Sequence, residues 1–338
     1  MRWAFSKNDG WARNARHTGY PEAMVNFGYT LMCEQTGPSE LVDDAVRAEE
    51  AGYDFAAVSD HFNPWLVEQG HSPFAWSVLG AAAYATQNLE LMTMVTCPTR
   101  RYHPAVVAQQ AATVGAMSQG RFTLGLGSGE NLNEHIAGAW PHRTQRHEML
   151  AEAIEIIRPL LAGETVHHGG TYFDVPEARL WDRPDEGVPV VLAVSGDGSM
   201  HLAEPLDGTV AVTPDASLRL PGRPAYGQVA LCYGPDESEC RKRALDQWRW
   251  FGLQWPVLAE LPDQRAFDDA AAFVTEDDVA AAVPCGPDVD RHVAAVRKYV
   301  DAGFTHVALV QIGGGNQEEF LTWSRSELLP ALHAEAGT

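Results

Sequence analysis

From Asn26 onward the sequence alternates between short apolar runs and longer segments with helical periodicity, and this alternation restricts the fold more than any other feature. Repeated strand–helix units of this kind build a parallel sheet that is covered by helices. The predicted strands span residues 26–34, 54–60, 89–96, 122–129, 189–195, 208–213, 226–233 and 306–312. A further pattern, in residues 166–180, predicts a hairpin outside the main sheet.

The segments between these strands carry helix signals. The first helix is predicted to begin at Pro38 and to stop at Gly52, because proline favours the first turn of a helix and glycine its end. Later helices are predicted over residues 73–86, 104–117, 144–161, 238–251, 288–302 and 318–334. Residues 252–275 are less regular, and we interpret them as an insertion that could act as a lid.

Eight strands and their crossovers, spread over about 310 residues without a break in composition, predict one closed barrel rather than an open sheet. The expected fold is therefore an α/β protein with a single (β/α)8 TIM barrel over residues 26–338. Residues 1–25 are polar and lack a hydrophobic period, so we interpret them as an N-terminal extension of the barrel.

Charge and composition narrow the possible partners. A net charge of −21 repels nucleic acid and anionic lipid, so neither is expected to bind. The chain has no apolar run of the roughly 18 to 20 residues that a membrane span needs, and its first residues contain no apolar signal core. Five scattered cysteines without a C-x-x-C pair argue against disulfides and structural zinc. A cytoplasmic location is predicted.

Polar residues directly follow several predicted strands, at the end of a barrel where active sites are built. They are Glu34-Gln35, Asp60-His61, Ser128-Gly129-Glu130-Asn131, Ser195-Gly196-Asp197 and Thr213. At a single strand end, capping of the next helix is the simpler explanation. Their coincidence at several ends favours a site, because one histidine with several carboxylates could supply an acid and a base.

Two other kinds of site fit the sequence less well. A metal site built on His61, Glu34, Glu130 and Asp60 lacks the usual histidine spacings, so no metal is expected. Residues 125–130 (GLGSGE) look superficially like a dinucleotide-binding loop, but the third glycine position is a glutamate. Trp65, in a predicted loop, is better placed to stack on a ring than the aromatic residues at helical spacing.

Four segments together resemble a known family: Glu34-Gln35, residues 59–65 (SDHFNPW), residues 101–106 (RYHPAV) and residues 127–134 (GSGENLNE). They look like the F420-dependent glucose-6-phosphate dehydrogenases of the luciferase-like superfamily, and the similarity runs from about residue 28 to residue 332. The resemblance implies a barrel, usually a homodimer, with the deazaflavin coenzyme F420 across its mouth. It also implies hydride transfer between a small-molecule substrate and carbon 5 of the ring.

The resemblance implies roles at matching positions of this chain. His61, Trp65 and Glu130 match catalytic residues, and Glu34 lies near them. The matching cofactor contacts are Asp60, Cys97, Ser128, Gly129 and Asn133, with Ser195 and Gly196 near the cofactor phosphate. Met94 and Val95 match a non-proline cis peptide bond that supports the ring. Which of His61 and Glu130 is the acid and which the base stays open.

The chain departs from this family where the substrate phosphate binds. The family uses two lysines and an arginine, whereas here Thr213 is followed by PDAS and residues 262–283 contain only Arg265. We therefore predict that glucose 6-phosphate is not the substrate, unless Arg219, Arg223 or Arg265 replaces the missing cations. An unphosphorylated alcohol, a ketone or an activated double bond fits better. The alternatives are an FMN-dependent monooxygenase of the same superfamily and a barrel that binds a ligand without catalysis.

Overall fold

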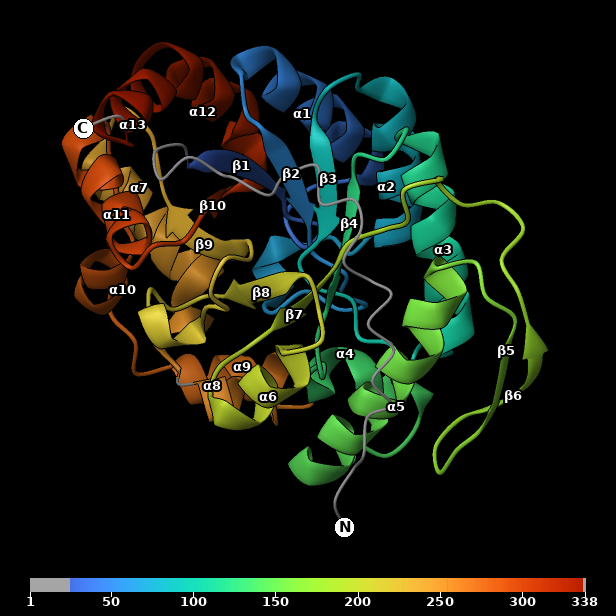
Figure 1. Ribbon diagram of the computed structural model, residues 1–338. Helices are drawn as coiled ribbons and strands as arrows, with labels where there is room; N and C mark the ends of the chain where they lie inside the picture. The colour runs from blue at the N-terminus through green and yellow to red at the C-terminus, as the bar shows by residue number, and fades with distance from the viewer. Residues whose placement is uncertain (1–24, 254, 337–338) are drawn as a thin grey trace.

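The computed structural model describes residues 25–253 and 255–336. Eight parallel strands close into a barrel in the order β1-β10-β9-β8-β7-β4-β3-β2 (Figure 1). Their bounds are β1 (Asn26–Leu31), β2 (Phe55–Val58), β3 (Glu90–Thr93), β4 (Phe122–Leu126), β7 (Val190–Ala193), β8 (Gly208–Ala211), β9 (Ala225–Leu231) and β10 (His306–Gln311). The predicted TIM barrel is confirmed. Apart from residue 25, the predicted N-terminal extension lies outside the described residues.

The predicted hairpin is also present. β5 (Val166–Gly169) and β6 (Asp174–Ala178) pair antiparallel and project from one side of the barrel in Figure 1. The Glu152 carboxylate, on the helix before the hairpin, accepts hydrogen bonds from the backbone N–H groups of Thr171, Tyr172 and Phe173. These bonds attach the turn of the hairpin to α5, outside the barrel sheet.

Helices follow the strands, and the longer ones cover the outside of the barrel in Figure 1. They are α1 (Pro38–Ala51), α2 (Ala75–Ala85), α3 (Pro104–Met117), α4 (Asn131–Glu134), α5 (Arg143–Leu161), α6 (Asp197–Ala203), α7 (Glu237–Trp248), α8 (Trp255–Leu258), α9 (Gln264–Ala271), α10 (Glu276–Ala282), α11 (Val289–Asp301), α12 (Gln317–Trp323) and α13 (Leu329–Ala336). Gly52 ends α1 with a φ of 97°, a left-handed conformation that glycine adopts at little cost. No helix among the described residues is long and apolar enough to cross a membrane.

Two predicted segments differ from the structure. The insertion at residues 252–275 is more regular than expected, because it contains α8 and α9. The predicted helix over residues 318–334 is interrupted by a wider turn at Ser324–Leu328. Pro330 has no N–H to donate to the carbonyl of Ser326, so a regular α-helical hydrogen-bond ladder cannot continue through this point. The interpretation of the insertion as a lid stays a prediction.

The inside of the barrel is filled by side chains at the amino ends of the strands. Phe55 packs edge-on against Tyr226, and Tyr226 stacks on His306 with ring centroids 4.3 Å apart. Gly28 pairs with Phe55 in the sheet, and a Cβ at Gly28 would lie 2.3 Å from the Phe55 ring. A filled interior of this kind leaves the opposite end, where the strands finish, to hold a site.

Candidate active site

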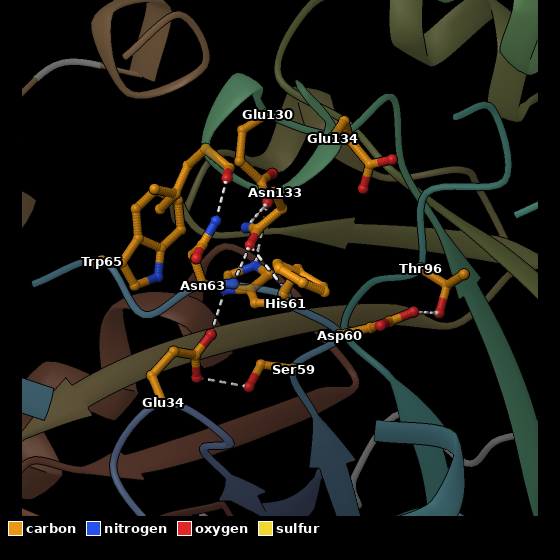
Figure 2. A network of polar contacts seen from close by, with 12 residues as sticks. Glu34, Ser59, Asp60, His61, Asn63, Trp65, Thr96, Glu130, Asn133 and Glu134 are labelled. Carbon is orange, nitrogen blue, oxygen red and sulfur yellow. Dashed lines mark hydrogen bonds and ion pairs between the residues drawn. The ribbon is translucent and has the colours of Figure 1, made fainter. Parts of the chain in front are cut away.

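The predicted site residues converge at the carboxyl ends of neighbouring strands. Glu34 follows β1 and His61 follows β2, each three residues beyond the strand, and Glu130 follows β4 by four residues. Figure 2 shows the three side chains pointing toward one another from these separate strand ends. The prediction that Glu34, His61 and Glu130 lie together at the mouth is confirmed geometrically.

His61 lies between two carboxylates. Its Nδ1 makes an ion-pair contact with Glu34 Oε1, and its Nε2 lies 3.3 Å from Glu130 Oε1. Glu34 Oε2 accepts a hydrogen bond of 2.7 Å from the hydroxyl of Ser59, which itself accepts one of 3.0 Å from the backbone N–H of Cys33. The Glu34 side chain is fully buried, whereas 13% of the His61 side chain and 12% of Glu130 are exposed. Glu34 is therefore the inner partner, and Glu130 lies toward the mouth.

This arrangement stabilises the charged forms of His61 and Glu34. Burial alone lowers the pKa of His61, but the carboxylates of Glu34 and Glu130 more than offset it and raise the pKa to about 9. Burial alone raises the pKa of Glu34, but the His61 ring and the Ser59 hydroxyl bring it below its ordinary value. At neutral pH the site thus holds an imidazolium whose Nε2 proton faces Glu130.

The raised pKa of His61 predicts a loss of stability at high pH. Relative to an ordinary value of 6.5, a folded-state pKa of about 9 gives stability that is fully present below pH 6.5. This contribution is lost as the pH rises through 9, and it amounts to roughly 3 kcal/mol. Chemical denaturation of wild-type and His61→Gln protein at pH 7 and pH 10 measures it. The difference between the two proteins should shrink at pH 10, and a constant difference would contradict the expectation.

Trp65 packs inside an aromatic cluster beside His61. It lies edge-on to the His61 ring, with centroids 5.1 Å apart, and stacks on Trp250 at 4.4 Å with an interplanar angle of 12°. Phe267 of α9 also lies edge-on to Trp65, with ring centroids 5.2 Å apart. Trp65 is buried, and its aromatic partners come from the end of the predicted helix 238–251 and from the predicted insertion. The sequence analysis assigned no role to Trp250, at the end of a predicted helix, or to Phe267, in the predicted insertion.

Asn133 joins the loop after β2 to Glu130. Its Nδ2 donates a 2.6 Å hydrogen bond to Glu130 Oε1, and its Oδ1 accepts 2.8 Å bonds from the backbone N–H groups of Phe62 and Asn63. The Asn63 side chain in turn donates to the carbonyl of Leu132 at 2.8 Å. Two segments that are far apart in the sequence are thus bonded to each other directly beside His61.

Asp60 points away from His61 in Figure 2, toward Thr96. Its carboxylate accepts hydrogen bonds from the hydroxyls of Thr96 at 2.7 Å and Tyr102 at 2.9 Å, and it forms an ion pair with Arg101 at 3.3 Å. Arg101 also donates to Glu134 at 2.7 Å. This buried network satisfies the Asp60 carboxylate, and it links the end of β2 to the segment that follows β3.

The other positions matched to the cofactor lie on three adjacent strand ends. Met94, Val95 and Cys97 follow β3, Ser128 and Gly129 follow β4, and Ser195 and Gly196 follow β7. The barrel order places β3, β4 and β7 next to one another. The Met94–Val95 peptide bond is cis, as the resemblance implied.

These residues form a rim along one side of the barrel mouth. Gly129 has a φ of 74°, and a Cβ there would lie 2.6 Å from the sulfur of Cys97, so the chain is closely packed under the rim. A Cβ at Gly196 would meet no atom within 4 Å, which leaves this backbone open to a close approach. Gly196 also precedes α6, and backbone N–H groups at such a place can receive an anion.

Two of the three arginines that could replace the family's phosphate-binding lysines lie at the opposite end of the barrel. Arg219 donates to the carbonyl of Ala302 at 2.9 Å, just before β10, and Arg223 donates to the carbonyl of Leu206, just before β8. Both therefore lie at the amino ends of the strands, opposite the mouth. The Arg265 side chain is 90% exposed on α9, close to Asp269. The possibility that Arg219 or Arg223 binds a substrate phosphate is thus wrong.

Among residues 25–253 and 255–336, no group of three or more His, Cys, Asp or Glu side chains could hold a metal ion. His61 and its two carboxylates are instead bonded to each other and to Ser59 and Asn133. A histidine held between two carboxylates in this way can act as a general acid or base.

Comparisons with known proteins agree with this description. The family model described as luciferase-like monooxygenase matches residues 24–306. An F420-dependent glucose-6-phosphate dehydrogenase of Microbacterium testaceum is 37% identical over 91% of this chain and 97% of its own length, and one of Nakamurella multipartita is 35% identical over 93% and 98%. A solved F420-dependent secondary alcohol dehydrogenase, in complex with an F420-acetone adduct, superposes with a TM-score of 0.82 at 27% identity, covering 91% of this chain and 99% of that one. The chain therefore belongs to the luciferase-like family, together with the F420-dependent glucose-6-phosphate dehydrogenases.

Proposed function

We propose that this protein is a coenzyme F420-dependent oxidoreductase that transfers a hydride between the deazaflavin and a small, unphosphorylated substrate. The substrate class is an alcohol or ketone, or a molecule with an activated C=C bond. The observation that carries the proposal is the placement of His61 between Glu34 and Glu130, beside the rim on β3, β4 and β7. The F420 dependence named for the curated relatives and for the solved alcohol dehydrogenase supports the choice of cofactor.

Bound F420 supplies the ring carbon that accepts or gives the hydride, and the protein supplies the proton chemistry. His61 Nε2 faces the mouth and holds a proton at neutral pH, because its pKa is raised to about 9 by the two carboxylates after burial is offset. It can therefore donate a proton to the oxygen of a ketone. Glu130, at the same Nε2, can accept a proton when an alcohol is oxidised. Glu34 holds the other side of the His61 imidazole through Nδ1.

An FMN-dependent monooxygenase would use the same barrel mouth. F420 is expected to bind the purified protein at least about tenfold more tightly than FMN, which corresponds to about 1.4 kcal/mol. Fluorescence titration with each cofactor at one ionic strength measures the two dissociation constants, with riboflavin as a control for ring stacking alone. Tighter binding of FMN, together with oxygen consumption by the reduced complex, would favour the monooxygenase.

We also propose that the protein forms a homodimer through α2 and α3. The two helices contact each other on the outside of the barrel. Neither of them contains a charged residue. Large apolar side chains there face solvent, including Tyr84, whose exposed fraction is 82%, and Phe74, Val106 and Met117. Because the net charge of −21 repels a second copy elsewhere, an uncharged face is the favourable place for two copies to meet. A monomer mass in light scattering would contradict this.

All five cysteines are free and buried in the described structure. We also propose that the protein is cytoplasmic, since free thiols suit a reducing compartment. Fractionation of the host cell tests this part.

A further inference from the structure

Asn133 is bonded on both of its polar atoms to the two segments that carry His61 and Glu130. Its Oδ1 accepts two backbone N–H groups, from Phe62 and Asn63, and so uses both lone pairs. Its Nδ2 donates to Glu130 Oε1 at 2.6 Å, the same carboxylate oxygen that lies 3.3 Å from His61 Nε2. One amide therefore holds the residue directly after His61 and the carboxyl group facing His61.

The burial of Asn133 limits what else its side chain can do. None of its surface is exposed, although Glu130 and His61 beside it are partly open to the mouth. Only one N–H of the amide has no bond named above, and it lies inside the protein. A buried side chain with its acceptor satisfied offers little to a ligand at the mouth.

We propose that Asn133 is a positioning residue that fixes Glu130 against His61, and that it does not bind the cofactor through its side chain. This inference rests on the proposed function only for its kinetic readout. It replaces the cofactor contact that the resemblance implies for Asn133. The hydrogen bond to Glu130 Oε1 fixes the orientation of this carboxyl group and its distance from the imidazole.

The variant Asn133→Asp separates the attachment of the loop after β2 from the hydrogen bond to Glu130. It has nearly the same shape and retains an oxygen for the N–H groups of Phe62 and Asn63, so the loop after β2 stays attached. It replaces the donor to Glu130 with a second carboxylate, and two carboxyl groups at hydrogen-bond distance share one proton. The Glu130 limb of the pH–activity profile should move to higher pH by about one unit or more. F420 affinity should change by less than about threefold, because no ring contact is removed.

The matched control is Asn63→Ala. Asn63 ties the same two segments together through the carbonyl of Leu132, but its side chain has no bond to Glu130 in the described structure. Its pH–activity profile should therefore keep its position. A profile of Asn133→Asp that coincides with that of the wild type would overturn the proposal. So would a loss of F420 affinity of about tenfold or more with unchanged kcat at saturating cofactor, since that result indicates a direct contact.

A second measurement is independent of turnover. In Asn133→Asp the folded protein keeps the shared proton above the pKa of about 4 that carboxyl groups have in an unfolded chain. Its stability relative to wild type should therefore fall as the pH rises from about 4 through the raised pKa of the carboxyl pair, and then level off. Adding Glu130→Gln removes the second carboxylate and should abolish this extra loss. If the protein shows no F420-linked turnover, the proposed function fails, but this pair of unfolding curves still tests the contact. An extra loss that persists in the double variant would overturn the role of Asn133.

Discussion

Replacing His61 with alanine is expected to lower kcat by about 10²-fold to 10⁴-fold while F420 still binds. The imidazole is the one group in the described site whose proton faces both Glu130 and the mouth, and its pKa, raised to about 9 by carboxylates that offset burial, keeps that proton in place at neutral pH. Alanine removes the proton donor and leaves the buried Glu34 carboxylate without its partner. Stopped-flow and steady-state rates with saturating F420 measure the loss.

The control for this variant is His167→Ala. His167 lies on β5, in the hairpin outside the barrel, and its side chain is mostly exposed, so kcat should stay within about twofold of wild type. Glu130→Gln is the companion at the site, since it keeps the shape of the side chain and removes the carboxylate facing Nε2. Unchanged turnover in both site variants would favour a barrel that binds its ligand without catalysis.

Most of the barrel could be predicted from the sequence because each strand and helix has a local signal. Apolar runs mark the strands, and Pro38 and Gly52 mark the ends of α1. The failures occur where distant residues decide the outcome. Residues 252–275 look irregular locally, but Phe267 of α9 is buried against Trp65, and this packing favours a helix there.

The candidate site, too, could be predicted only in part from the sequence. Glu34, His61 and Glu130 could be placed together, because the carboxyl ends of barrel strands meet at one rim. The orientation of a side chain after a strand could not be predicted. Asp60 is adjacent to His61, but its carboxylate turns toward Thr96 and Tyr102, since these hydroxyls satisfy it inside the protein. Its matched role as a cofactor contact stays a prediction.

Glucose 6-phosphate is expected to be turned over with a kcat/KM about 10²-fold to 10⁴-fold below that of the best unphosphorylated alcohol. Two phosphate-binding lysines of the resembled family have no counterpart here, and each charge-assisted hydrogen bond contributes about 1.5–3 kcal/mol. Arg219 and Arg223 cannot replace them, because both bond to carbonyls at the amino ends of the strands. The names of the curated relatives favour the opposite outcome, so steady-state assays with glucose 6-phosphate and a series of secondary alcohols are decisive.

A single added cation tests the cause of the discrimination. Asp215 follows β8 at the mouth and is exposed, so Asp215→Lys replaces a repulsive charge with an attractive one where the chain lacks it. This change should raise kcat/KM for glucose 6-phosphate by about tenfold or more and leave the alcohols nearly unaffected. Glu204→Lys changes the net charge equally, but Glu204 precedes β8, at the far end of the barrel, so it should have little effect. Equal gains from both variants would show that the overall field of an acidic protein, and not a missing contact at the mouth, excludes the phosphate.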